Sequence, residues 1–316
     1  MYYPFIRGKQ FELVMLREMA PRIAQWGFVP IIEPVRENFP ALKRAIKELV
    51  DNNCRFILIA NPCVGELKDN DSSLCSEILD SDILQLYAKY SVGINLTGND
   101  TKGKVKSYLA EHNKRIALIH NGFSDGKWLA ELIKETKPTI TEHIFIEGKR
   151  LYRRHFPKVK GVKRVLIQDG FKIYNNRDYP NEEQFSELYL TYNEMNCDGF
   201  GDFLIVGNEY RDGGGPAYAI AIHLTYTDPK ADDAIAIKHY ISDQVDTPKD
   251  PAGKFLEALR KLVNDVEKHR SPILKTTAVK EYLQLYNDKH FPGLGYVKKL
   301  SMQHHIELMA HLLKGA

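Results

Sequence analysis

The sequence predicts an α/β protein, a TIM-like (β/α)8 barrel with an added β-hairpin and a C-terminal helical segment. Short apolar runs recur along the chain, and each ends in a polar residue before a turn, as in VPIIEP, IALIHNG and VLIQDG. Buried parallel strands have this continuous apolar character. Helical patterns separate the runs, and eight strand and helix steps favour a closed barrel over an open doubly wound sheet.

The predicted elements follow one another in a regular order. The strands are expected at residues 2–7, 28–33, 55–60, 92–97, 115–120, 142–147, 164–169 and 202–206. Helices are expected at residues 10–25, 40–52, 83–90, 101–113, 128–134, 150–156 and 182–193, with a long polar loop at 63–82. The run at 92–97 is the weakest strand. If it lies outside the barrel, the later run at 217–226 is the closing strand.

The pattern changes after the eighth strand. Residues 217–226 and 234–242 are β-rich runs around a polar turn and predict a hairpin, in which His223 and His239 are cross-strand neighbours. The rest of the chain is mainly helical. We therefore assign residues 1–250, including the hairpin at 217–242, to the barrel, and residues 251–316 to a helical segment packed on it.

Composition limits the possible functions. The chain of 316 residues has 44 basic and 41 acidic side chains, so a generic nucleic-acid coat is not indicated. The four cysteines match no metal-binding or disulfide pattern, which predicts a reduced, cytoplasmic protein without a catalytic cysteine. The chain starts without a signal-peptide pattern, and no apolar stretch approaches the ~20 residues of a membrane helix, so no membrane association is expected.

Polar residues at the strand ends are the candidate site, because all strand carboxyl ends of a barrel open on one face. Arg7 and Lys9 at the first strand end and Arg211 in the glycine-rich loop 209–216 are predicted to bind a phosphate group. Asn61, at the end of the third strand, is a further candidate for substrate binding.

Acidic residues end four other runs. Grouped carboxylates can hold a divalent metal ion or act as an acid and base pair, and a histidine can transfer protons near neutral pH. The predicted catalytic residues are Glu33, His120, Asp169 and Glu209, and the candidate metal ligands are Glu33, Glu147, Asp169 and Glu209. Each carboxylate alone is explained better by helix capping or an ion pair, and His120 is explained equally well as a structural histidine, so only their convergence favours function.

Several segments resemble one known family. They are YPFIRGKQFE at 3–12, PIIEP at 30–34, GFGDFLIVGNEYRDGGGPAYAIAIHLTY at 199–226 and QHH at 303–305. Together they are similar to the phage and bacterial "beta protein" family, and most closely to a bacterial branch of it. The family has no assigned reaction. The resemblance implies a phage-defence setting and a nuclease-like companion protein, because members occur in phages and in defence-like bacterial neighbourhoods beside such a protein.

Two functions from different classes follow. The first is a hydrolase-type enzyme, such as a phosphoester hydrolase, that acts on a nucleotide or nucleic acid, and its carboxylates either hold a divalent metal ion as cofactor or act as bases. The alternative is a non-enzymatic sensor or adaptor that binds a ligand or the companion protein. A direct DNA-binding module is least supported, since the sequence shows no recognition-helix motif.

Overall fold

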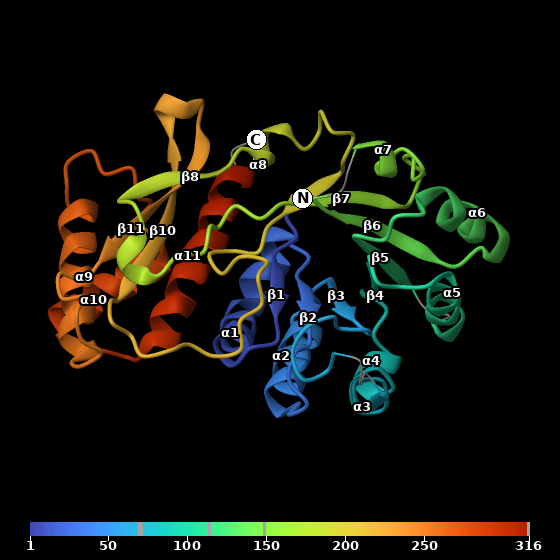
Figure 1. Ribbon diagram of the computed structural model, residues 1–316, viewed down its shortest axis with the longest axis horizontal. Helices are drawn as coiled ribbons and strands as arrows, with labels where there is room; N and C mark the ends of the chain where they lie inside the picture. Colours follow the sequence, from blue (N-terminus) through green and yellow to red (C-terminus); the bar gives the residue numbers. More distant parts are fainter. Residues whose placement is uncertain (69–71, 113–114, 148–149, 315–316) are drawn as a thin grey trace. The chain divides into compact units, whose positions relative to one another are not determined.

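The computed structural model describes residues 1–68, 72–112, 115–147 and 150–314. Eight parallel strands form one sheet in the order β1-β2-β3-β4-β5-β6-β7-β9. The sheet curves into a nearly closed barrel, and its strands alternate with helices along the chain (Figure 1). The strands are β1 Phe5–Arg7, β2 Ile31–Glu33, β3 Phe56–Ile59, β4 Tyr90–Thr97, β5 Ile116–Asn121, β6 Ile140–Ile146, β7 Lys163–Ile167 and β9 Gly199–Gly201. The predicted fold class is confirmed.

The barrel comes nearest to closure where β9 meets the segment that enters β1. Tyr2 and Phe200 form a parallel bridge, and the Tyr3 N–H donates to the Phe200 carbonyl over 2.8 Å. Gly201 is required here because a Cβ at this position would overlap the backbone oxygen of Tyr3. The question of the closing strand is thereby answered: β4 lies between β3 and β5 in the barrel, and the run at 217–226 is not one of its strands.

Helices follow the first six strands and lie on the outer side of the sheet (Figure 1). They are α1 Gln10–Trp26, α2 Pro40–Asp51, α4 Asp82–Gln85, α5 Lys102–Glu111, α6 Gly126–Thr136 and α7 Arg150–Arg153. In α1 the buried Leu13, Leu16, Ala20 and Ile23 recur at helical spacing, and the helix ends at Gly27, whose φ of 69° is left-handed. The polar stretch predicted as a loop contains α3 Ser72–Leu74 and a π-helical turn, Cys75–Leu79.

The chain forms two compact units. The first comprises Met1–Gln168 and Thr191–Asp202 and holds all eight barrel strands; the second comprises Asp169–Leu190 and Phe203–Ala316. This division differs from the predicted one, in which the hairpin belonged to the barrel. The hairpin is grouped with the C-terminal helices, because its apolar face packs against them.

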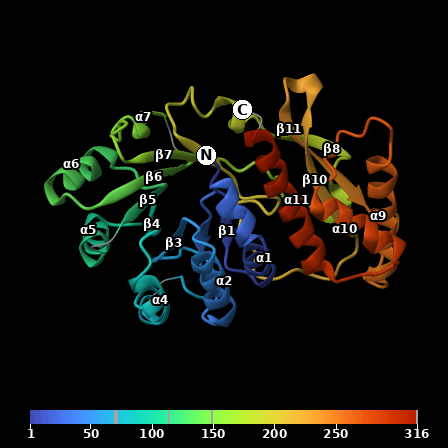
Figure 2. The same ribbon diagram turned by 180° about the vertical axis from the view of Figure 1, so that it is seen from behind.

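The second unit has its own sheet and core. The antiparallel strands β8 Glu182–Ser186, β10 Ala221–Asp228 and β11 Ala234–Ile241 pair in the order β10-β11-β8. Figure 2 shows α9 Pro251–Val266, α10 Thr277–Asn287 and α11 Leu294–Lys314 beside this sheet. Alternate residues of β10, Ile222, Leu224 and Tyr226, share a core with Leu259 and Leu262 of α9. The predicted hairpin is thus confirmed.

Two predicted elements are wrong. Residues 182–193 do not form one helix: β8 pairs with β11, and only the short α8, Leu188–Thr191, is helical. The eighth barrel strand is Gly199–Gly201 rather than 202–206, because Leu204 has a left-handed φ of 53° and the apolar run turns instead of extending. In both places tertiary pairing overrides local sequence preference.

Candidate functional site

Five polar side chains gather at the carboxyl ends of β1 to β5 in the first unit. They are Arg7, Glu33, Cys63, Asn95 and Asn121, and we refer to them as the strand-end cluster. The β1 and β2 strands pair so that Arg7 lies beside Glu33, and side chains in a strand point alternately to its two faces. Barrel topology therefore brings together residues that are more than one hundred positions apart in sequence.

Glu33 is the most connected member of the cluster. Its side chain is almost completely buried. One carboxylate oxygen, Oε2, lies 3.5 Å from Arg7 Nε, and the other, Oε1, accepts from the Cys63 backbone N–H over 3.0 Å and from the Cys63 thiol over 3.4 Å. A buried carboxylate needs such partners, since an uncompensated charge is costly to remove from water.

Cys63 is partly exposed, and its sulfur lies among amide groups. Asn95 Nδ2 donates to Sγ over 3.2 Å, and Asn121 Nδ2 lies 3.9 Å from it. Burial raises the pKa of the Cys63 thiol to about 12, and the charge of Glu33 and its hydrogen bond act in the same direction. The thiol is therefore protonated near neutral pH, with its hydrogen directed at a carboxylate that can accept it.

Asn61 positions Asn95. Its Nδ2 donates to the Asn95 carbonyl over 2.8 Å, and its Oδ1 accepts from the Asn95 backbone N–H over 2.8 Å. Asn61 was predicted to bind substrate, but its described contacts hold β4 in place. Asn95 itself is 1% exposed, and its Oδ1 has no hydrogen-bond partner within the described residues.

The loop after β3 holds Cys63 over Glu33. Gly65 has a φ of 80°, and a Cβ there would overlap the Val35 carbonyl oxygen in the loop after β2. The Glu66 N–H donates to that same carbonyl over 3.0 Å, and Arg36 Nη1 pairs with Glu66 Oε1 at 2.5 Å. The two loops are tied together, and this fixes where the thiol lies.

His120, predicted as a catalytic residue, is not among the described partners of Cys63 or Glu33. Since Asn121 directs its amide toward Cys63, the preceding residue points to the other face of β5. His120 Nδ1 lies 2.9 Å from the Tyr152 hydroxyl and Nε2 lies 3.0 Å from His143 Nδ1, among aromatic rings. Burial, followed by the nearby His143, lowers the pKa of His120 well below its usual value, so the ring stays neutral.

The remaining basic and acidic candidates of the first unit, Lys9 and Glu147, take no part in the described contacts of the strand-end cluster. Lys9 is partly exposed at the N-terminal cap of α1, where it makes no capping hydrogen bond through its side chain. Glu147 is exposed, and its backbone N–H donates to Ile167. Neither is among the described partners of Cys63 or Glu33.

Three further candidates belong to the second unit. Asp169 accepts from the backbone N–H groups of Phe171 over 3.0 Å and Asn208 over 2.6 Å, as a loop-capping carboxylate does. Glu209 and Arg211 are exposed and pair with each other at 2.9 Å. Across the ranges that the structure describes, no three His, Cys, Asp or Glu side chains lie close enough to hold a metal ion. The predicted metal-ligand set is therefore not assembled there.

Four histidines of the second unit have structural partners. His223 and His239 are cross-strand neighbours as predicted, and their Nδ1 atoms are 2.7 Å apart. His304 Nε2 donates to the Thr225 carbonyl over 2.7 Å, and His305 Nδ1 lies 2.9 Å from the Thr225 hydroxyl. These bonds fasten α11 to β10.

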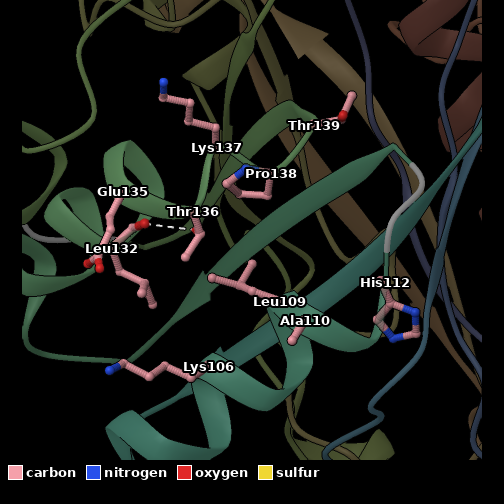
Figure 3. A pocket seen from close by; sticks show the side chains of 10 residues that line it. All are labelled: Lys106, Leu109, Ala110, His112, Leu132, Glu135, Thr136, Lys137, Pro138 and Thr139. Carbon is pink, nitrogen blue, oxygen red and sulfur yellow. Dashed lines mark hydrogen bonds between the residues drawn. The ribbon is translucent and has the colours of Figure 1, made fainter.

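A hollow of about 520 Å³ lies away from the strand-end cluster, between the carboxyl ends of α5 and α6 (Figure 3). Leu109, Leu132 and Pro138 form its apolar wall, and Lys106 and Lys137 lie at its edge. It adjoins Thr139, just before β6 begins, and so belongs to the amino-terminal side of the strands. In barrels that side contributes to stability rather than to chemistry.

Comparisons with known proteins identify no relative. No family model, no curated protein and no solved structure matches the chain. The resemblance to the "beta protein" family stays a prediction. Within the described residues, every helix is too short or too polar to span a lipid bilayer.

Proposed function

We propose that this chain is a hydrolase-type enzyme whose reaction centre is the strand-end cluster. Cys63 acts as the nucleophile and Glu33 as its proton acceptor. The observation that carries the proposal is the 3.4 Å contact between the Cys63 thiol and Glu33 Oε1. A thiol is intrinsically a strong nucleophile once deprotonated, and an adjacent base allows this at a pH well below the thiol pKa.

The proposed reaction has two steps. Sulfur attacks the electrophilic atom of the substrate while the thiol proton passes to Glu33, and the protonated Glu33 then gives that proton to the leaving group. In the second step Glu33 takes a proton from water, the hydroxide displaces sulfur, and the thiol regains its proton. Asn95 and Asn121 N–H groups near Sγ stabilise charge that develops there, and Arg7 holds the second oxygen of Glu33.

This proposal keeps the predicted hydrolase class and changes its chemistry. The sequence favoured carboxylates with a metal ion, whereas the described contacts favour a thiol and one carboxylate. Arg7 pairs with Glu33 and Arg211 with Glu209. Because both arginines already have carboxylate partners, they do not single out a phosphate group as the substrate. A phosphate-bearing substrate is therefore one class to test against others.

Model substrates test the proposal directly. Hydrolysis of p-nitrophenyl acetate and p-nitrophenyl phosphate is measured for the natural chain and for Cys63→Ala, with Cys75→Ala as the matched control because Cys75 is also partly exposed. We expect one substrate to turn over and Cys63→Ala to lose about 100-fold or more of that rate, while Cys75→Ala keeps it.

An acid-quenched reaction adds a second readout. Mass spectrometry of peptides from a p-nitrophenyl acetate reaction should show an acetyl group on Cys63, and Glu33→Gln should slow the loss of this group, because Glu33 takes the proton from the attacking water. Full activity in Cys63→Ala, with melting temperature unchanged, would contradict the proposal. If the Cys63→Ala variant keeps the full effect that the protein has in cells, the sensor or adaptor function is favoured instead.

A further inference from the structure

We infer that the substrate presents an N–H group to Asn95, so that the reaction is hydrolysis of a carboxamide. This inference rests on the proposed function and names its substrate class. It starts from Asn95, which is 1% exposed and lies beside the proposed nucleophile.

The hydrogen-bonding groups of Asn95 can be counted. Its backbone N–H and its carbonyl are both bonded to Asn61, and its Nδ2 donates to Cys63 Sγ. Its Oδ1 is the group that has no partner among the described residues. A buried acceptor without a donor is costly, and native proteins rarely keep one unless water or a ligand fills the need.

The hydrogen bond of the Cys63 thiol determines which atom of the Asn95 side-chain amide faces the sulfur. The thiol hydrogen is donated to Glu33, so the sulfur offers lone pairs to its other neighbours. The Asn95 atom that faces sulfur is therefore the Nδ2 donor, and Oδ1 lies on the same planar amide, next to the nucleophile. A ligand N–H that bonds to Oδ1 must belong to a group close to the atom that sulfur attacks.

A carboxamide meets both requirements, because its nitrogen carries the N–H and is bonded to the electrophilic carbon. A phosphoester or carboxylic ester offers only acceptor oxygens at this place and lacks this hydrogen bond, so it reacts there only when it is strongly activated, as a p-nitrophenyl ester is. Sulfur adds to the carbonyl carbon, the C–N bond breaks, and the amine leaves with the proton held by Glu33. Water then converts the thioester to a carboxylic acid and the free thiol.

Two alkylating reagents that differ in this one group test the inference. 2-Chloroacetamide and methyl chloroacetate react with a thiol by the same displacement of chloride, but only the amide has N–H donors. The rates of alkylation of Cys63 are measured by peptide mass spectrometry and divided by those of Cys75 in the same chain. We expect the amide reagent to be favoured at Cys63 by about tenfold, the effect of one hydrogen bond to a buried acceptor.

The preference should depend on Asn95. In Asn95→Leu the acceptor is gone, and the normalised rates of the two reagents should become equal. A measurement on the natural chain gives the same information if this variant does not fold: acetamide should slow alkylation of Cys63 by iodoacetamide more than methyl acetate does at equal concentration.

The outcomes separate the two proposals. Equal normalised rates and no protection by acetamide, with Cys63 still alkylated, overturn the amide inference and leave the nucleophile proposal in place. If Cys75 is labelled by both reagents and Cys63 by neither, the thiol is inaccessible, and the inference fails together with the proposed function.

Discussion

The reactivity of Cys63 depends on side chains that come from other strands. Burial raises its pKa to about 12, and Glu33 contributes both through its charge and through a hydrogen bond. Replacing the carboxylate by a neutral amide removes two of these causes and leaves Arg7, whose charge favours the thiolate. The structure thus predicts how one substitution changes the titration of another residue.

We expect Glu33→Gln to lower the pKa of Cys63. The rate of alkylation by iodoacetamide, followed at Cys63 against pH, should rise at a lower pH in the variant than in the natural chain. Glu77→Gln, which changes an exposed carboxylate paired with Lys43, is the matched control and should leave the profile unchanged. An identical profile in Glu33→Gln would show that the carboxylate does not control the thiol.

Single residues also show how far the sequence predicts the site. Arg7, Glu33 and Asn61 were predicted at strand ends and lie there, because apolar runs mark strand ends well. The alternation along β5 favours Asn121 over His120, and this choice depends on a register that one sequence does not reveal. Cys63 was passed over because it matches no motif. The available signal was its position two residues after Asn61, in the same strand-end loop.

Among the elements, the loop after β3 carries the most specific requirement. Gly65 has a left-handed φ of 80° and lies against the Val35 carbonyl, whereas Gly161 has a similar φ of 88° and no atom within 4 Å of an added Cβ. The two glycines have nearly the same backbone conformation and differ in their surroundings. They form a matched pair for separating backbone strain from steric overlap.

We expect Gly65→Ala to lower the melting temperature more than Gly161→Ala. Both variants place a side chain in the left-handed region, at about 1 kcal/mol each, but only Gly65→Ala also forces the loop away from Val35. Because that loop holds Cys63 over Glu33, Gly65→Ala should also slow alkylation or turnover at Cys63. Equal melting temperatures and equal Cys63 reactivity in the two variants would show that the loop contact has no such role.

The elements themselves were predicted unevenly, for physical reasons. Continuous apolar runs identified seven barrel strands within a few residues, since burial on both faces leaves a strong signal. The eighth barrel strand was predicted a few residues too late, because the β9 sequence, Gly-Phe-Gly, has low strand propensity. The position of β9 is determined by its close approach to Tyr3. β8 was taken for a helix because Glu and Leu favour helices, while its partner β11 imposes an extended strand.

At the level of the whole molecule, buried histidines occur in both units. Burial lowers the pKa of His143 to about 4, with Arg164 acting in the same direction, and burial is also the main cause that lowers the pKa of His304 to about 4. His143 is in the first unit and His304 in the second. In the unfolded chain both imidazoles recover a pKa near the ordinary value of about 6.5. Folding therefore excludes protons that the unfolded chain would bind.

This difference predicts a loss of stability in mild acid. Because the folded pKa is lower than the unfolded one, the stabilisation is present above about pH 6.5 and is lost as pH falls from there toward 4. Each of the two histidines should reduce the free energy of unfolding by about 2 kcal/mol between pH 7.5 and pH 5. Calorimetric melting temperatures at the two pH values should show this decrease.

Histidine variants identify which imidazole causes the pH dependence of the melting temperature. His143→Gln removes one titrating ring. At pH 7.5 the variant should have a lower melting temperature than the natural chain, and its melting temperature should fall less between pH 7.5 and pH 5. His290→Gln changes an exposed histidine and should leave the pH dependence as it is. A melting temperature that does not fall between pH 7.5 and pH 5 would mean that these imidazoles are protonated within the fold. The hydrogen bond between His120 and His143, which needs at least one neutral ring nitrogen as acceptor, would then have to be reassigned.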